Sequence, residues 1–174
     1  MFGQSLFDEC LDLVRKWKPR NEYPNELKYR DDLMDFLHIN LNQSNNLFSG
    51  RRNVKIKKEA SRSLCDIGIG NSQVGIELKK DLKTKSQINR LQGQIEDYED
   101  DYNEGVIVVL VGKIDKFVEN DLLHKLNKRL NNSMGFGVQQ FRIKLVNKST
   151  TKNKESPKRN NNPFGIDLGF GGFN

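Results

Sequence analysis

The sequence predicts an α/β domain with a central mixed β-sheet flanked by helices, and three features support this prediction. Residues 64–81 contain two short apolar strands joined by a polar turn at Asn71 and Ser72, which is typical of a β-hairpin. Residues 106–112 form a continuous apolar run, as expected for a strand buried on both faces. Segments with apolar residues at helical spacing lie before and after these strands. The predicted order is helix, helix, strand, hairpin, helix, strand, helix, strand.

The composition indicates one domain with a modest core. The 174 residues are 35% hydrophobic and 30% charged, with a formal net charge of +6. This basic balance is compatible with nucleic acid, an anionic membrane or neither as a partner. The two cysteines form no disulfide framework, and the N-terminal segment has acids where a signal peptide is apolar. Since no apolar run approaches the roughly 20 residues that span a bilayer, we expect a soluble, cytoplasmic protein with no membrane partner.

Two helices are expected in the N-terminal part. Residues 5–17 place apolar side chains at helical spacing, and Pro19 ends this segment. A second helix is predicted from about Pro24 to about Leu41, with Asn25 or Tyr23 near its cap. The residues expected on the inner faces of these helices are Leu6, Phe7, Cys10, Leu11, Val14, Trp17, Leu27, Leu33, Met34, Phe36 and Leu37.

Residues 54–59 predict a strand that leads into the hairpin, within the most basic part of the domain. Two interpretations of its charges stay open. One is an edge strand that lysines protect against pairing with another chain. The other is a rim that contacts nucleic-acid phosphates, because sequence-independent binding is largely charge neutralisation. The basic residues here are Arg51, Arg52, Lys55, Lys57, Lys58 and Arg62.

The hairpin is predicted to bury one face and to carry charge on the other. Asp66, Glu77 and Lys79 share the charged face, and a turn at residues 71–72 places Asp66 directly across from Glu77. Cross-strand Cβ atoms lie roughly 4.5–5.5 Å apart, so the two carboxylates repel each other. A divalent cation would reverse this repulsion, and Mg²⁺ or Mn²⁺ suits such oxygen ligands. The expected core face holds Cys65, Ile67, Ile69, Val74, Ile76 and Leu78.

Besides the apolar strand at residues 106–112, three elements are predicted after the hairpin. A helix is predicted over residues 84–102, with a polar strip beside its apolar stripe. Asp115 is expected to cap a helix that runs to about Leu130, and residues 141–146 supply a last strand. The polar strip of the first helix consists of Gln87, Gln94 and Tyr98, with Arg90 further round. The expected core residues of the two helices are Ile88, Leu91, Ile95, Tyr102, Val118, Leu122, Leu123, Leu126 and Leu130.

Asp66 followed by Glu77-Leu78-Lys79 at the end of a hairpin resembles the PD-(D/E)XK nuclease superfamily, without the proline of the motif's name. The resemblance covers residues 24–146 and implies a restriction-endonuclease-like core. It also implies that Asp66, Glu77 and the Leu78 carbonyl hold one or two Mg²⁺ or Mn²⁺ ions. Glu26 would join them directly or through water, and Lys79 would orient the attacking water or stabilise charge on the phosphate.

A second motif, Gln94-x-x-x-Tyr98, resembles an element of RecB-type nucleases in the same superfamily. It implies that Gln94 hydrogen-bonds the site or the DNA backbone and that Tyr98 supports it. For Glu26 the alternative is an acid that stabilises a helix start through the helix dipole, and Glu22 is the fallback. The residues expected to contact nucleic acid are Arg51, Arg52, Lys55, Lys57, Arg62, Lys80 and Arg90.

The function expected from these motifs is metal-dependent hydrolysis of phosphodiester bonds in DNA, in repair, recombination or defence. A Holliday-junction resolvase, which would be a homodimer, or a restriction endonuclease of the same fold stays open. A non-catalytic nucleic-acid-binding module is the third reading. His38 and His124 have no partner at metal-ligand spacing, which argues against zinc sites and histidine-dependent hydrolysis.

The last 27 residues form a separate region in this prediction. Residues 1–147 make up the nuclease-like domain, and residues 148–174 are expected to be a basic disordered tail. The tail ends in an apolar, Gly/Phe-rich peptide at residues 163–173. Either this is an unstructured end with no specific partner, or it is a linear motif that binds a protein partner.

Overall fold

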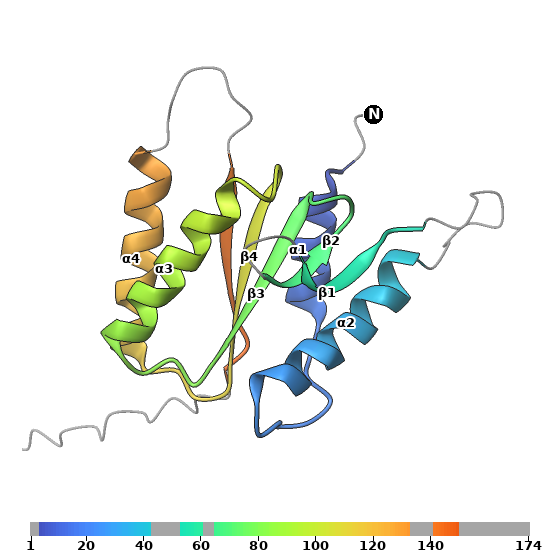
Figure 1. Ribbon diagram of the computed structural model, residues 1–174. Coiled ribbons are helices and arrows are strands. Elements are labelled where there is room, and N and C mark those ends of the chain that lie inside the picture. The colour runs from blue at the N-terminus through green and yellow to red at the C-terminus, as the bar shows by residue number, and fades with distance from the viewer. Residues whose placement is uncertain (1–3, 43–52, 61–64, 133–140, 150–174) are drawn as a thin grey trace, which may run out of the picture.

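A computed structural model describes residues 4–42, 53–60, 65–132 and 141–149. Within these ranges the chain is an α/β protein whose elements follow the predicted order (Figure 1). Its elements are α1 (Leu6–Lys16), α2 (Glu26–Asn42), β1 (Ile56–Ala60), β2 (Cys65–Ile69), β3 (Val74–Lys80), α3 (Lys85–Glu99), β4 (Gly105–Val111), α4 (Lys116–Asn132) and β5 (Arg142–Asn147).

The strands form one mixed sheet in the order β1-β2-β3-β4-β5. β1, β2 and β3 pair antiparallel, whereas β3, β4 and β5 pair parallel through the crossover helices α3 and α4. Ile67 lies opposite Ile76 and Ile69 opposite Val74, which is the register predicted from the turn at residues 71–72. The register matters because a slip by one residue would turn every side chain of a strand to the other face.

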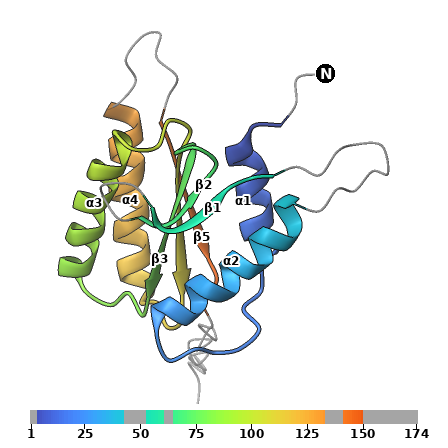
Figure 2. The ribbon, with the colours of Figure 1, turned by 45° about the vertical axis from the view of Figure 1, so that its right-hand side comes forward.

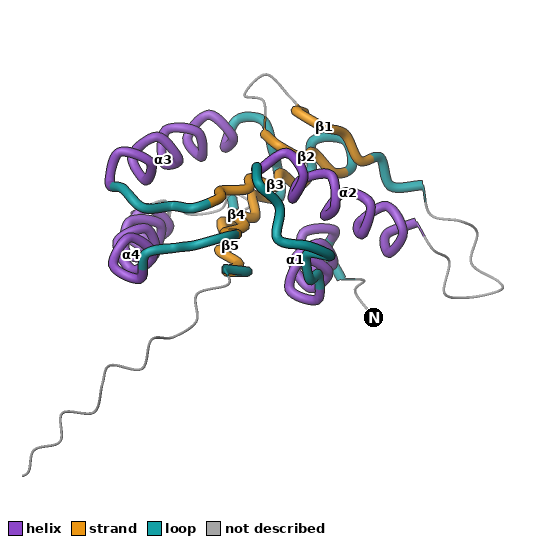
Figure 3. The backbone as a smooth tube through the Cα atoms, turned by 90° about the horizontal axis from the view of Figure 1, so that it is seen from below, coloured by secondary structure: helices purple, strands orange, loops and turns teal. Residues whose placement is uncertain are grey.

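Two pairs of helices cover the two faces of the sheet. α1 and α2 lie against one face and α3 and α4 against the other, as Figures 2 and 3 show. Ile67, Ile69 and Leu78 pack under α1 and α2. The other face of the hairpin, which the sequence analysis left uncovered, lies under α3 and α4, so Glu77 is only 2% exposed. On the charged face of the hairpin, Glu77 is therefore buried, whereas Asp66 and Lys79 are partly exposed.

Cys65 lies on the opposite side from its predicted position. It belongs to the core cluster under α3 and α4, not to the cluster of Ile67 and Ile69. A Cβ added to Gly75 would stand 3.1 Å from the Cys65 sulfur and 3.1 Å from the Tyr102 ring. Gly75 thus leaves the space that the thiol and the ring occupy. Cys10 and Cys65 are both buried free thiols.

Most helix boundaries agree with the sequence, and the caps explain why. The Asn25 side chain accepts a hydrogen bond from the Lys28 amide at 3.1 Å, and Asp115 accepts from the Phe117 amide at 2.9 Å. Thr84 and Gln87 form a reciprocal capping box at the start of α3. The caps satisfy amides that have no partner inside the helix.

Some predicted core residues of the helices are exposed. Leu27 is 52% exposed and Leu123 is 37% exposed, because the buried stripes of α2 and α4 run through Leu33 and Leu37 and through Leu122. Tyr102 lies beyond the end of α3 but is buried against Tyr98. None of these differences changes the order of the elements.

Several predictions concern residues outside the described ranges. They include the basic residues Arg51, Arg52 and Arg62 and the tail with its terminal peptide, residues 163–173. Across the described ranges, every helix is too short or too polar to span a lipid bilayer.

Gly105 provides a test of the β4–β5 pairing. Its φ is +133°, and a Cβ there would stand 2.1 Å from the Arg142 carbonyl oxygen. We expect Gly105→Ala to lower the free energy of unfolding by more than about 2 kcal/mol, since clash and backbone strain add. Gly93→Ala in α3, whose Cβ would meet nothing within 4 Å, should instead raise it by roughly 0.5–1 kcal/mol. Urea unfolding of both variants measures the difference; equal stabilities would contradict the described pairing.

Candidate active site

The candidate site lies where β3 continues past the end of its pairing with β2. The paired register stops at Ile67 and Ile76, whereas β3 continues to Lys80. Two amides on this free edge of β3 bond to carboxylates instead of backbone. The Leu78 amide donates to Asp66 Oδ2 at 2.8 Å, and the Lys80 amide donates to Glu26 Oε2 at 2.8 Å. Since the N–H and C=O of one strand residue point to the same side, the Leu78 carbonyl also faces this gap.

The third carboxylate, Glu77, is held from two sides on the face of the sheet under α3. The Tyr98 hydroxyl donates to Glu77 Oε2 at 2.7 Å, and Lys79 Nζ lies 2.5 Å from Glu77 Oε1. Tyr98 reaches it because α3 packs across this face with Ile88, Leu91 and Ile95 as its buried stripe. The two contacts satisfy both oxygens of a side chain that is almost fully buried.

Lys79 is the cation at the centre of these acids. Its Nζ lies 4.0 Å from Glu26 Oε1 in addition to its contact with Glu77. Burial lowers the pKa of Lys79, but the charge and the hydrogen bond of Glu77, together with the charges of Glu26 and Asp66, raise it above its usual value. Lys79 is therefore positively charged at neutral pH.

The surroundings of Asp66 disfavour the charged form of its carboxyl group. Burial and the charge of Glu77 raise the pKa of Asp66 from 3.8 to about 7, against the opposing effects of the Leu78 amide and of Lys79. Within the described part of the chain, its other oxygen, Oδ1, accepts no hydrogen bond. Three carboxylates thus surround one ammonium group, and the site has an excess of negative charge.

The structure brings together five of the six predicted catalytic residues: Glu26, Asp66, Glu77, Lys79 and Tyr98 are connected by the contacts above. Gln94, the sixth, has a buried side-chain oxygen without a hydrogen-bond partner among the described residues. Glu22, the fallback for Glu26, is exposed.

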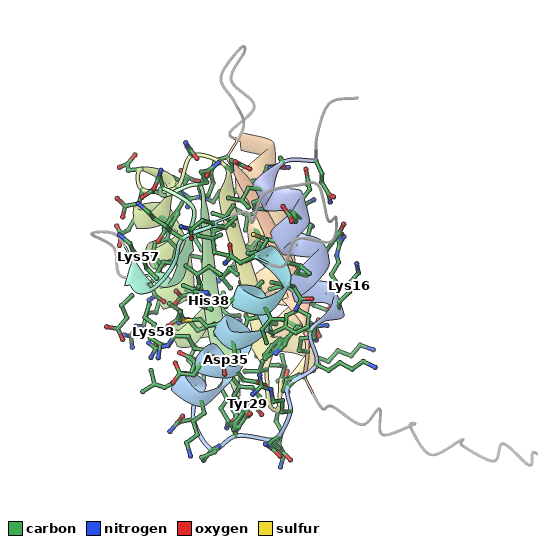
Figure 4. The ribbon with its side chains drawn as sticks, turned by 90° about the vertical axis from the view of Figure 1, so that its right-hand side faces the viewer. Lys16, Tyr29, Asp35, His38, Lys57 and Lys58 are labelled. Atoms are coloured by element: carbon green, nitrogen blue, oxygen red, sulfur yellow. The ribbon has the colours of Figure 1, made fainter. Side chains whose placement is uncertain are left out.

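The predicted nucleic-acid contacts are more scattered. Lys57 is exposed on the edge strand β1 and Lys55 is exposed just before it, and Figure 4 shows Lys57 near Lys58 beside α2. Arg90 is exposed on α3, and Lys80 pairs with Asp81. His38 and His124 are exposed on helices, and Figure 4 shows His38 on α2.

The sequence analysis did not identify one buried charged residue near the site. Arg30 is only 7% exposed and donates to Glu59 Oε1 at 2.9 Å, which ties α2 to β1. It follows Glu26 by one helical turn, so the spacing Glu26-x-x-x-Arg30 was the available signal. Its role is to fix the helix that delivers Glu26.

The residues fit a hard divalent cation by their chemistry. Carboxylates of Asp66, Glu77 and Glu26 and the carbonyl of Leu78 are the oxygen donors that Mg²⁺ and Mn²⁺ prefer. The excess of negative charge favours a further cation, and one that binds Glu77 would share this carboxylate with Lys79. The described residues contain no group of three or more His, Cys, Asp or Glu side chains already arranged around a metal position.

Comparisons with protein-family models, with curated proteins and with solved structures give no match to this chain.

Asp66 gives a prediction for stability in EDTA. Because the folded protein binds the Asp66 proton more tightly than the unfolded chain, its contribution to stability falls as the pH rises from about 4 to about 7. Asp66→Asn should remove this loss, so the variant gains on the order of 1–3 kcal/mol over the wild type between pH 4 and pH 8. Thermal unfolding across this pH range measures the gain.

Asp81→Asn is the matched control for this experiment. The hydrogen bonds from Lys80 and from the Lys113 amide lower the pKa of Asp81, so its stabilisation is present at neutral pH and is lost in acid. This variant should lose stability at pH 8. A pH-independent difference between wild type and Asp66→Asn would contradict the described environment of Asp66.

Proposed function

We propose that the protein is a metal-dependent nuclease that hydrolyses phosphodiester bonds in DNA, related in fold and site to the PD-(D/E)XK superfamily. The observation that carries the proposal is the convergence of Asp66, Glu77 and Lys79 with Glu26 on one end of β3. The element order and the mixed sheet agree with the restriction-endonuclease-like core that the motif implies.

Each residue has a defined part in this proposal. Asp66, Glu77 and the Leu78 carbonyl would hold Mg²⁺ or Mn²⁺, and Glu26 would join them. The ion would lower the pKa of a bound water and stabilise charge on the phosphate. Lys79 is charged and lies within the acid cluster, so it would stabilise negative charge that develops on the phosphate or orient the water.

Tyr98 acts as a positioning residue in this scheme. Burial and the nearby charge of Glu77 raise the pKa of Tyr98 above its usual value, so its hydroxyl remains a donor to Glu77 across the physiological pH range. The bond fixes one Glu77 oxygen and leaves the carboxylate aligned with Lys79. Outer partners of this kind orient ligands and alter the affinity of a metal site.

The proposal explains why Glu77 is buried and Lys79 is largely buried. An ordinary hairpin face in contact with solvent would leave both side chains exposed. Glu77 and Lys79 are paired along β3, as an ordinary surface strand would pair them, but Glu77 is 2% exposed and the Lys79 side chain 19%. Removing charges from water is costly, and an excess of acids adds repulsion. A metal-dependent site uses such an arrangement, because a bound cation offsets the repulsion between the acids.

The first functional test is cleavage of DNA by the purified protein. We expect cleavage with Mg²⁺ or Mn²⁺ and none with EDTA. Asp66→Ala and Lys79→Ala should each lower the rate at least about 100-fold, because the first removes a ligand of the proposed metal ion and the second removes a positive charge that would stabilise the transition state. Linear, circular, single-stranded and four-way-junction DNA are the substrates, so that a resolvase or a restriction-type endonuclease is recognised by its preference.

Asp97→Ala and Lys128→Ala serve as controls, because both residues are exposed on helices. They should retain the wild-type rate. Circular dichroism establishes that the inactive variants are folded. Retained cleavage by folded Asp66→Ala would remove the proposed function.

Tyr98→Phe tests the positioning role separately. Loss of the hydroxyl leaves Glu77 Oε2 without its buried donor, so we expect a loss of about 1–3 kcal/mol in the free energy of unfolding. The metal concentration for half-maximal cleavage should rise roughly 10-fold. Tyr102→Phe, which packs against the Tyr98 ring, should leave this concentration unchanged. If both variants behave alike, Tyr98 has only a packing role.

A further inference from the structure

Two chain connections lie side by side at the end of the sheet where β3 and β4 finish (Figures 1 and 3). Three hydrogen bonds join them. The Asp81 amide donates to the Val111 carbonyl at 3.1 Å, the Lys113 amide to Asp81 Oδ1 at 2.7 Å, and the Asp115 amide to the Leu82 carbonyl at 3.3 Å. Residues 80–85 and 112–117 therefore form one continuous surface.

This surface is strongly basic. Its lysines outnumber its two acids, Asp81 and Asp115, and both acids are engaged within the protein. Asp81 accepts from Lys80 and from the Lys113 amide, and Asp115 caps α4 through the Phe117 and Val118 amides. Four of the lysines, Lys83, Lys85, Lys113 and Lys116, are exposed to the solvent, whereas Lys80 is partly buried and pairs with Asp81. The lysine patch, as we name this surface, consists of Lys80, Lys83, Lys85, Lys113 and Lys116.

An aromatic ring stands within the lysine patch. Phe117 is 69% exposed, and Lys85 Nζ lies 5.9 Å from its ring centroid. Its backbone is fixed because the Phe117 amide bonds to Asp115 Oδ1. The other exposed large hydrophobic residues of the described chain, Leu27, Ile39 and Leu123, are aliphatic. An exposed ring on a fixed backbone, with a lysine ammonium group beside it, matches the chemistry of a nucleotide, which has a flat base and a charged phosphate.

The lysine patch begins at the candidate active site. Lys80 directly follows Lys79, and Lys83 lies four residues after Lys79. Even a fully extended chain spans at most about 14 Å over four residues. This is on the order of two nucleotides, so a strand that contacts the patch has little distance to cover before it reaches Lys79.

We propose that single-stranded nucleic acid binds across the lysine patch, with phosphates on Lys83 and Lys116 and one base stacked on the Phe117 ring. Stacking requires an accessible base face, which a strand has when unpaired and lacks inside a duplex. Binding to the patch does not depend on the proposed nuclease. The expectation that the bound strand continues to Lys79 does rest on the proposed nuclease function. If both hold, the substrates of the nuclease are strands with unpaired bases.

The basic edge strand β1 is the competing surface. Lys57 is exposed on β1 and Lys55 just before it, but Lys58 is paired with Asp31 at 2.8 Å. The described residues of β1 include no exposed aromatic side chain. The edge therefore offers charge for phosphates without a surface for base stacking.

Fluorescence anisotropy in EDTA tests the proposal on the full-length protein without cleavage. The probes are a labelled 20-nucleotide DNA strand, the same strand in a duplex, and an RNA strand of the same sequence. Lys83→Gln/Lys116→Gln should weaken single-strand binding about 10-fold and reduce the salt dependence of log K by about 1.4, because two phosphate contacts are lost. Lys55→Gln/Lys57→Gln removes the same charge from β1 and the residue before it, and should have less than a twofold effect.

Phe117→Ala should weaken single-strand binding about 10-fold with little effect on the duplex, whereas Leu123→Ala, on the same helix, should change neither. Tight binding of either the DNA or the RNA strand with this pattern supports the proposal. A larger loss from the β1 pair, or an equal loss for strand and duplex in Phe117→Ala, overturns it. Asp66→Ala should bind the single strand normally, so failure of the nuclease assay and failure of this one are separate results.

Discussion

The candidate site depends on one constraint, the unequal length of two neighbouring strands. β3 extends beyond the part that β2 pairs, and a buried amide without a partner is costly. Asp66 and Glu26 provide the missing acceptors for the amides of Leu78 and Lys80. The backbone of β3 therefore determines where two carboxylates stand, although one comes from the neighbouring strand and the other from the start of α2.

These contacts place acids together against their mutual repulsion. The single ammonium of Lys79 lies among three carboxylates, and the pKa of Asp66, raised to about 7 by burial and by Glu77, reflects the imbalance. Tyr98 and the backbone amides supply hydrogen bonds that hold the acids in place without neutralising them. A site of this kind is more stable with an additional cation, which links its electrostatics to the metal-dependent chemistry proposed for it.

Helices cover both faces of the sheet, so the site lies at the end of the strands. α1 and α2 pack on one face of the sheet and α3 and α4 on the other (Figure 3). Ligands of open α/β sheets bind at the carboxyl ends of parallel strands, where connections leave the sheet. In this protein the acids lie along the last residues of β3, and the lysine patch begins at the same end. Acidic and basic surfaces thus meet at Lys79 and Lys80.

The sequence predicted the elements because local patterns encode them. The turn at residues 71–72 fixed the register of the hairpin, and the apolar run of β4 predicted its burial on both faces. The acids and Lys79 were recognised as one set because they share the hairpin. Leu27 and Leu123 were misplaced, since an apolar residue beside a helical stripe can face either the core or the solvent.

By itself, the sequence determined the mixed α/β order, the hairpin register and the group of Asp66, Glu77 and Lys79. The tertiary structure alone decided that α3 buries Glu77, that the Lys80 amide bonds to Glu26, and that Cys65 fills the space beside Gly75. It also decided that residues 80–85 and 112–117 form one basic surface around Phe117. The physical reason is that periodicity defines which side of a strand or helix a residue takes, whereas burial and hydrogen-bond partners depend on segments distant in the chain.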